Sequence, residues 1–169
     1  MNRRRLRRED GQAMVEFVLV FPLLLVMVLM LVEFGFALNA YISVNNASSE
    51  AARYAAVGSA PNGVGPCDSG AVSPSIEGLA VRASNNTVTC SEVTVRYLKR
   101  MPGSQYVRGD AVSIRVERDY TMVTPLSGLA SAFSFGTIPS TFSISACAEA
   151  RLERGPTDQS GLLTGGGCT

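Results

Sequence analysis

Hydrophobic residues follow three different patterns along the chain, and each pattern predicts a different element. Between residues 17 and 38 the sequence is almost continuously apolar, and Glu33 is its one charged residue. At about 1.5 Å per residue, a helix of this length reaches roughly 33 Å, enough to cross a bilayer core of about 30 Å. The first pattern therefore predicts a membrane span over about 17–38. Pro22, near its start, either is tolerated there or kinks the helix.

The second pattern begins beyond the span, where apolar positions take on helical spacing. The apolar positions follow steps of 4, 3, 4 and 3 and fall on one helical stripe: Ala40, Val44, Ala47, Ala51 and Tyr54. Gly58 and then Pro61 predict the end of this helix. The favoured partner for the stripe is the chain's own sheet. A neighbouring subunit's helix is the alternative partner. The stripe can also contact the sheet at one level along the helix and a neighbouring helix at another.

The third pattern is alternation of apolar and polar residues, which predicts strands over residues 93–97, 112–117 and 142–153. Each strand has one apolar face, which needs a cover. The alanine stripe can supply that cover, so the predicted fold is α+β, with the outer half of the long helix packed on a small antiparallel sheet.

Two shorter segments also have helical spacing. Residues 74–86 predict a short helix, with Ser73 as its cap and Pro74 at its start. Residues 125–135 carry a helix-like apolar set capped by Thr124, which is either core or an apolar insertion that faces a partner.

Charge is distributed unevenly around the apolar run. Five arginines precede it, while ten basic and ten acidic residues from Glu50 onward balance each other. Arginine-rich short flanks stay in the cytoplasm, so we expect the N-terminus inside and the C-terminus outside. Without an overall basic field, we expect no nucleic-acid partner. The charged leader, residues 1–11, has no periodicity and is expected to be solvated and disordered.

All four cysteines lie on the expected outer side: Cys67, Cys90, Cys147 and Cys168. An even count in an oxidising compartment predicts two disulfides, and sequence alone does not choose among the three pairings. Cys147 falls on the polar face of its strand, and Cys168 follows three glycines in the tail. These positions favour Cys147–Cys168, and with it Cys67–Cys90.

The segment around Gly11 has two interpretations. It is either only the flank of an anchor or the end of a leader that a peptidase removes after Gly11. Glu16 then either sits at the cytoplasmic interface or faces the new α-amino group of Gln12, one helical turn away. Because a carboxylate in lipid costs about 2.5–3.5 kcal/mol on insertion scales, pairing with an ammonium gives this spacing a mechanism.

Several short motifs occur together over residues 11–58: Gly11-Gln12-Ala13-Met14-Val15-Glu16-Phe17, then Pro22, then Glu33-Phe34-Gly35, and then Glu50-Ala51-Ala52-Arg53-Tyr54-Ala55. This run resembles the TadE-like pseudopilin family of tight-adherence type IV pili. The resemblance implies cleavage between Gly11 and Gln12 by prepilin peptidase, with Gly11, Glu16 and Phe17 as the matching positions.

The resemblance implies a pilin-like organisation: a leader over 1–11, a long helix over 12–58, an exported domain over 59–154 and a flexible glycine-rich tail over 155–169. The implied function is that of a minor structural subunit which helps to initiate or cap the filament. The implied partners are membrane lipid, other pilin and pseudopilin subunits, prepilin peptidase and the assembly platform. The implied location is the cytoplasmic membrane, and after assembly the extracellular pilus.

Other functions have weaker support in the sequence. The chain contains no histidine, the commonest general base and a common zinc ligand, and no phosphate or dinucleotide fingerprint. We therefore expect no catalytic residues, no metal and no cofactor. Arg108-Gly109-Asp110 is best explained as a glycine turn that enters a strand. The alternative function is that of an unprocessed, signal-anchored exported domain that binds an extracellular ligand.

Overall fold

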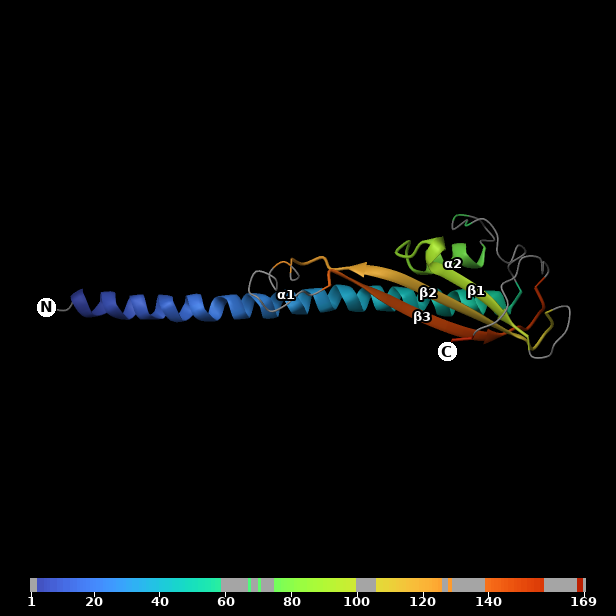
Figure 1. Ribbon diagram of the computed structural model, residues 1–169, viewed down its shortest axis with the longest axis horizontal. Helices are drawn as coiled ribbons and strands as arrows, with labels where there is room; N and C mark the ends of the chain where they lie inside the picture. Colours follow the sequence, from blue (N-terminus) through green and yellow to red (C-terminus); the bar gives the residue numbers. More distant parts are fainter. Residues whose placement is uncertain are drawn as a thin grey trace. The chain divides into compact units, whose positions relative to one another are not determined.

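The computed structural model describes residues 3–58, 67, 70, 75–99, 106–125, 128, 139–156 and 167–168, without the side chains of residues 3–10. The chain separates into two compact units. We call Met1–Ala37 with Thr121–Thr141 the helix unit, and Leu38–Tyr120 with Phe142–Thr169 the sheet unit. Figure 1 labels the elements of both.

The first element is helix α1, Arg3–Ala56, which runs without a break through Pro22. The expectation of a disordered leader is wrong, because α1 begins at Arg3. Arginine and leucine are good helix formers, and extending an existing helix costs far less than nucleating one. At the other end, Gly58 has a φ of +66°, and its N–H donates to the carbonyl of Ala55. The prediction that the helix ends at Gly58 is confirmed.

The sheet unit contains a three-stranded sheet in the order β1-β2-β3, with β1 at Val93–Leu98, β2 at Ala111–Thr121 and β3 at Thr141–Arg151. β1 and β2 pair antiparallel with Val95 opposite Ile114. Figure 1 shows β3 running opposite to β2. All three predicted strands are present, so the α+β prediction is confirmed.

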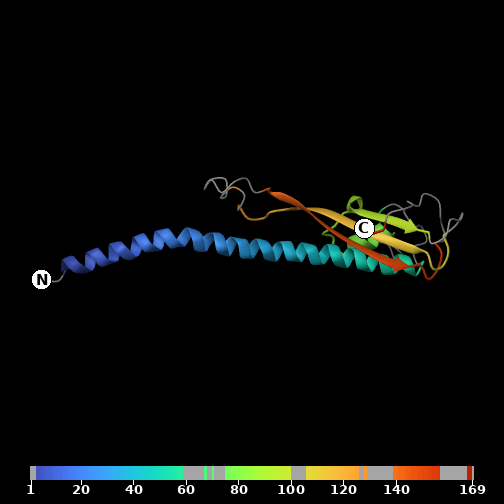
Figure 2. The same ribbon diagram turned by 60° about the horizontal axis from the view of Figure 1, so that its bottom comes forward.

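The apolar core lies on one face of the sheet. Its strand side chains are almost fully buried and alternate along the strands: Val93, Val95, Tyr97, Val112, Ile114 and Val116. From α1, Val44, Ala47 and Ala51 are completely buried, which confirms the predicted stripe. Figure 2 shows the strands on one side of this C-terminal segment of α1. The small alanines allow the helix backbone to approach the sheet closely.

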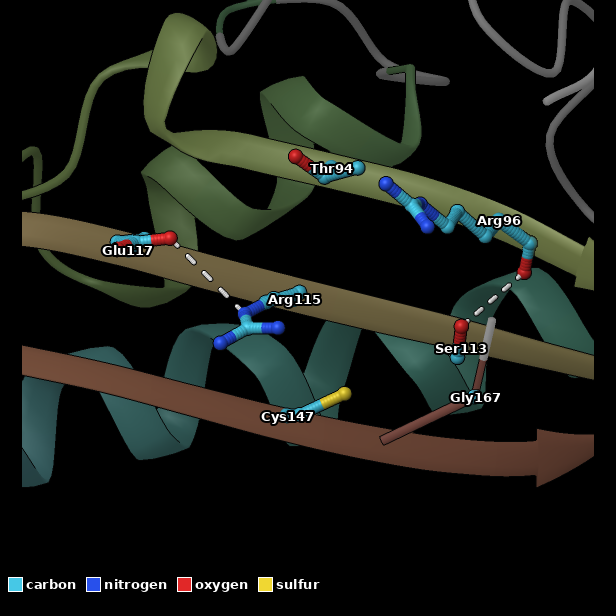
Figure 3. A pocket seen from close by; sticks show the side chains of 7 residues that line it. All are labelled: Thr94, Arg96, Ser113, Arg115, Glu117, Cys147 and Gly167. Carbon is cyan, nitrogen blue, oxygen red and sulfur yellow. Dashed lines mark hydrogen bonds and ion pairs between the residues drawn. The ribbon is translucent and has the colours of Figure 1, made fainter. Parts of the chain in front are cut away.

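Helix α2, Ile76–Ala83, covers the same face beside β1 (Figure 3). Its cap is Ser75, whose Oγ accepts the N–H of Gly78 at 3.0 Å, so the predicted cap at Ser73 is wrong. The helix also ends earlier than predicted, because Asn85 and Asn86 have φ values of +56° and +58°. Asparagine tolerates this left-handed conformation, which stops a helix.

Candidate functional site

The candidate processing segment, Gly11 to Phe17, lies within α1, and each of its residues is exposed. A Cβ placed on Gly11 would meet nothing within 4 Å. The Gln12 amide nitrogen Nε2 donates to Glu16 Oε1 at 3.3 Å, which shows that residues 12 and 16 share one helix face. Phe17 stacks at a tilt on Phe21, with ring centroids 5.3 Å apart. The segment is therefore accessible, and Glu16 already faces the residue whose amine cleavage would create.

In the part of the chain that the structure describes, most of the apolar stretch of α1 is uncovered. Every side chain from Gly11 to Val32 is exposed or half-exposed, including bulky ones such as Leu19, Leu23 and Leu31. The helix is long and apolar enough to cross a membrane. Monomeric soluble proteins rarely expose an apolar surface of this extent, so this surface is suited to contact with lipid or other helices.

Glu33 interrupts this exposed surface as a buried carboxylate, only 8% accessible. Its Oε1 accepts the N–H of Val123 at 3.2 Å, and its Oε2 accepts the N–H of Thr124 at 2.8 Å. Both donors belong to the connection that follows β2, and both lie in the helix unit. Sequence patterns flagged Glu33 as the one charge in the span but did not identify its partners, which are 90 residues away.

A second buried carboxylate, Glu77, lies on α2 in the sheet unit. Burial raises the pKa of Glu77, although hydrogen bonds from its own backbone N–H and from Ser75 act in the opposite direction. Glu77 Oε2 is buried and has no hydrogen-bond partner among the residues that the structure describes. Burial, and then the negative charge of Glu77, raise the pKa of Tyr97 to about 12. The helical spacing of apolar residues in the sequence did not mark Glu77 as buried.

The open face of the sheet carries a polar cavity of about 250 Å³ (Figure 3). Its walls come from β1, β2, β3 and the C-terminal tail: Thr94, Arg96, Ser113, Arg115, Glu117, Cys147 and Gly167. Arg115 Nε lies 3.9 Å from Glu117 Oε2, and both side chains are more than half exposed, so this ion pair adds little stability. Two guanidinium groups and two hydroxyls give the cavity the chemistry to bind an anionic group.

Two disulfides fix the edges of the sheet unit. One joins Cys67 to Cys90, at the start of the short 3₁₀ turn Cys90–Glu92, and the other joins Cys147 on β3 to Cys168 in the tail. These are the pairs that the cysteine positions favoured. The N–H of Cys168 donates to Glu149 Oε1 at 2.6 Å, which adds a second attachment for the tail. The bond at Cys147 therefore places Gly167 in the cavity wall.

The remaining candidate motifs have structural roles. Gly109, with a φ of +96°, forms a turn with Asp110, whose Oδ2 accepts the N–H of Val107 at 2.9 Å. The interpretation of Arg108-Gly109-Asp110 as a glycine turn is confirmed. Among the residues that the structure describes, no group of three or more possible metal ligands occurs. Apart from Pro125 and Gly128, the predicted helix over 125–135 lies outside the described residues, as does most of the glycine-rich tail.

Comparison with known families finds a match for the N-terminal part of the chain. Residues 11–53 match the model of a family described as TadE-like protein, which confirms the resemblance stated from the sequence motifs. No curated protein and no solved structure matches the chain. The matched segment contains the processing candidates, the exposed apolar surface, Glu33 and most of the alanine stripe. The similarity of this segment suggests a pilus-associated protein, and together with the apolar helix it suggests membrane anchoring.

Proposed function

We propose that this chain is a minor pilin-like subunit of a tight-adherence pilus, released from its leader by prepilin peptidase and helping to initiate or cap the filament. The observation that carries the proposal is the family match over residues 11–53. Support comes from the exposed apolar helix, which suits storage in a bilayer before assembly and packing against other helices afterwards.

The mechanism that we propose is electrostatic at the N-terminus and apolar along the helix. Cleavage between Gly11 and Gln12 would create an ammonium group on Gln12. The carboxylate of Glu16, one turn away, would face that ammonium in the same or a neighbouring subunit and neutralise it in an apolar setting. The subunit would then leave the cytoplasmic membrane as its helix packs against those of other pilins on the assembly platform.

Mass spectrometry of the chain from a host with an active prepilin peptidase tests the first step. We expect a mature N-terminus at Gln12, and an intact Met1 would overturn the processing step. Glu16→Ala tests the second step, with filaments counted by electron microscopy. We expect export and folding to persist while filaments are lost, and normal filament numbers in this variant would refute the role of Glu16. Glu50→Ala, at an exposed position on the same helix, is the control.

The polar cavity on the sheet favours one alternative, an unprocessed exported domain that binds a ligand. Arg96 and Arg115 are the residues that would carry such binding. Under this alternative, Arg115→Ala abolishes ligand capture, whereas Glu16→Ala and a blocked cleavage site have no consequence. Under the pilin proposal, Glu16→Ala and a blocked cleavage site abolish filaments, whereas Arg115→Ala has no consequence for them.

A further inference from the structure

The carboxylate of Glu33 connects two segments that are far apart in the sequence. It lies on the apolar stretch between Phe17 and Leu38, and it accepts the backbone N–H groups of Val123 and Thr124. Next to these contacts, the N–H of Met122 donates to the carbonyl of Ser140 at 2.8 Å. The start of the β2–β3 connection is therefore fastened to α1 within the helix unit.

The position of Glu33 fixes the depth of this connection relative to the span. Glu33 precedes Leu38 by five residues, or about 8 Å along the helix, which places it in the outer half of the expected span, midway between the boundary and the centre. A carboxylate there needs hydrogen-bond donors, because an unpaired buried charge is costly. Since Val123 and Thr124 supply two of these donors, they lie at the same depth as Glu33.

The connection also has the composition of a lipid-facing segment. No charged residue occurs between Asp119 and Glu149. Val123 is 66% exposed, Met122 is half-buried, and Pro125 is exposed. An uncharged segment that presents valine and methionine at a membrane boundary gains free energy by inserting these side chains among the lipid headgroups and upper acyl chains.

We propose that Met122–Pro125 is a second membrane contact, held by Glu33 in the outer half of the bilayer, where Val123 touches lipid. The occupant of this surface is lipid because the segment is hydrogen-bonded to Glu33 within the apolar stretch of α1 and carries no charge. Glu33 is a positioning residue, since it acts through the two backbone amides. The inference rests on the membrane insertion of α1 that the proposed function includes, and not on cleavage or pilus assembly.

Tryptophan fluorescence of the full chain in liposomes tests the inference, because the natural sequence contains no tryptophan. Three single-tryptophan variants are compared in brominated and ordinary lipids: Val123→Trp, Val107→Trp and Leu24→Trp. Val107 is a matched control, a 57% exposed valine in the sheet unit beside the charged Arg108. Leu24, within the span, reports insertion of α1.

We expect a blue-shifted emission and loss of fluorescence in brominated lipid for Val123→Trp and Leu24→Trp, and neither for Val107→Trp. If Leu24→Trp is quenched and Val123→Trp is not, the second contact is absent while α1 is inserted. If neither is quenched, α1 is not inserted and the inference fails together with the membrane part of the proposed function. If Val123→Trp is blue-shifted but resists both brominated lipid and a soluble quencher, protein rather than lipid covers it, which also overturns the inference.

The role of Glu33 is tested by adding Glu33→Gln to the Val123→Trp chain. The amide side chain keeps the size of Glu33 but offers one acceptor oxygen instead of two. We expect quenching by brominated lipid to decrease while the far-UV circular dichroism stays unchanged. Glu50→Gln, at an exposed position of the same helix, should leave the quenching as it was. Unchanged quenching in the Glu33→Gln chain would remove Glu33 from this role.

Discussion

The two halves of α1 use apolar side chains in opposite ways. Before Val32 most of the bulky residues, such as Leu23 and Leu24, are exposed, and only Val26 and Leu29 are half-buried. Beyond Leu38 the apolar residues are mostly alanines on one stripe, and Val44, Ala47 and Ala51 are fully buried. One continuous helix is therefore suited to two different environments. Its first half is suited to contact with lipid or other helices, and its second half packs on the chain's own sheet.

The largest expected effect comes from introducing the same residue, aspartate, into each half of α1. Ala47→Asp places an unpaired carboxylate in the core of the sheet unit, and we expect a loss of stability above about 4 kcal/mol. Met27→Asp should leave that stability unchanged and instead disfavour membrane insertion by about 3 kcal/mol. Chemical denaturation in detergent and an insertion assay measure the two quantities.

The control for this pair is Asn46→Asp, at an exposed position next to Ala47. A change within about 0.5 kcal/mol is expected there. If Ala47→Asp and Met27→Asp proved equally harmful to the stability of the sheet unit, the division of α1 into a lipid-facing and a core-facing half would be wrong.

An intermediate effect is expected for the disulfides, which belong to the sheet unit alone. Cys67–Cys90 and Cys147–Cys168 close chain segments of 23 and 21 residues, so each should stabilise the fold by about 3 kcal/mol. Replacing either pair of cysteines by serine should lower the free energy of unfolding by about that amount, seen as a lower denaturation midpoint. A variant that lacks both disulfides should lose the sum of the two free energies, and insertion of α1 into liposomes should be unaffected.

The smallest expected effect concerns Glu77, the buried glutamate of the sheet unit. Because burial raises the pKa of Glu77 above its ordinary value of 4.5, the folded state holds that proton more tightly than the unfolded state. This contribution to stability is present below the unfolded pKa and is lost as the pH rises through the folded pKa. Glu77→Gln, which mimics the protonated form, should therefore match the natural chain at acidic pH and exceed it at neutral pH.

We expect a gain for Glu77→Gln of about 1–3 kcal/mol at neutral pH, since Oε2 of the natural residue is buried with no partner in the described part of the chain. Denaturant unfolding at several pH values, with Glu50→Gln as an exposed control, measures it. A constant difference between the two chains across the pH range would show that Glu77 does not titrate on unfolding.

Sequence reasoning succeeded where a pattern repeats. The alternating residues of β1 and β2 and the helical steps from Ala40 to Tyr54 predicted elements that the structure contains. It failed at single positions. Ser73 and Ser75 are equally good helix caps by residue type, and only the conformation of Ser75 selects it. The cleavage site at Gly11 stays a prediction, because an exposed helix is compatible with cleavage and with its absence.

The sequence by itself determined the long apolar helix, the alanine stripe, the three strands and the similarity to the TadE-like family, because each depends on residues close together in the chain. Only the tertiary structure decided that Glu33 binds the amides of Val123 and Thr124, and that Glu77 is buried without a full set of partners. The physical reason is that a charged group's environment is set by what the fold brings to it, which local spacing does not encode.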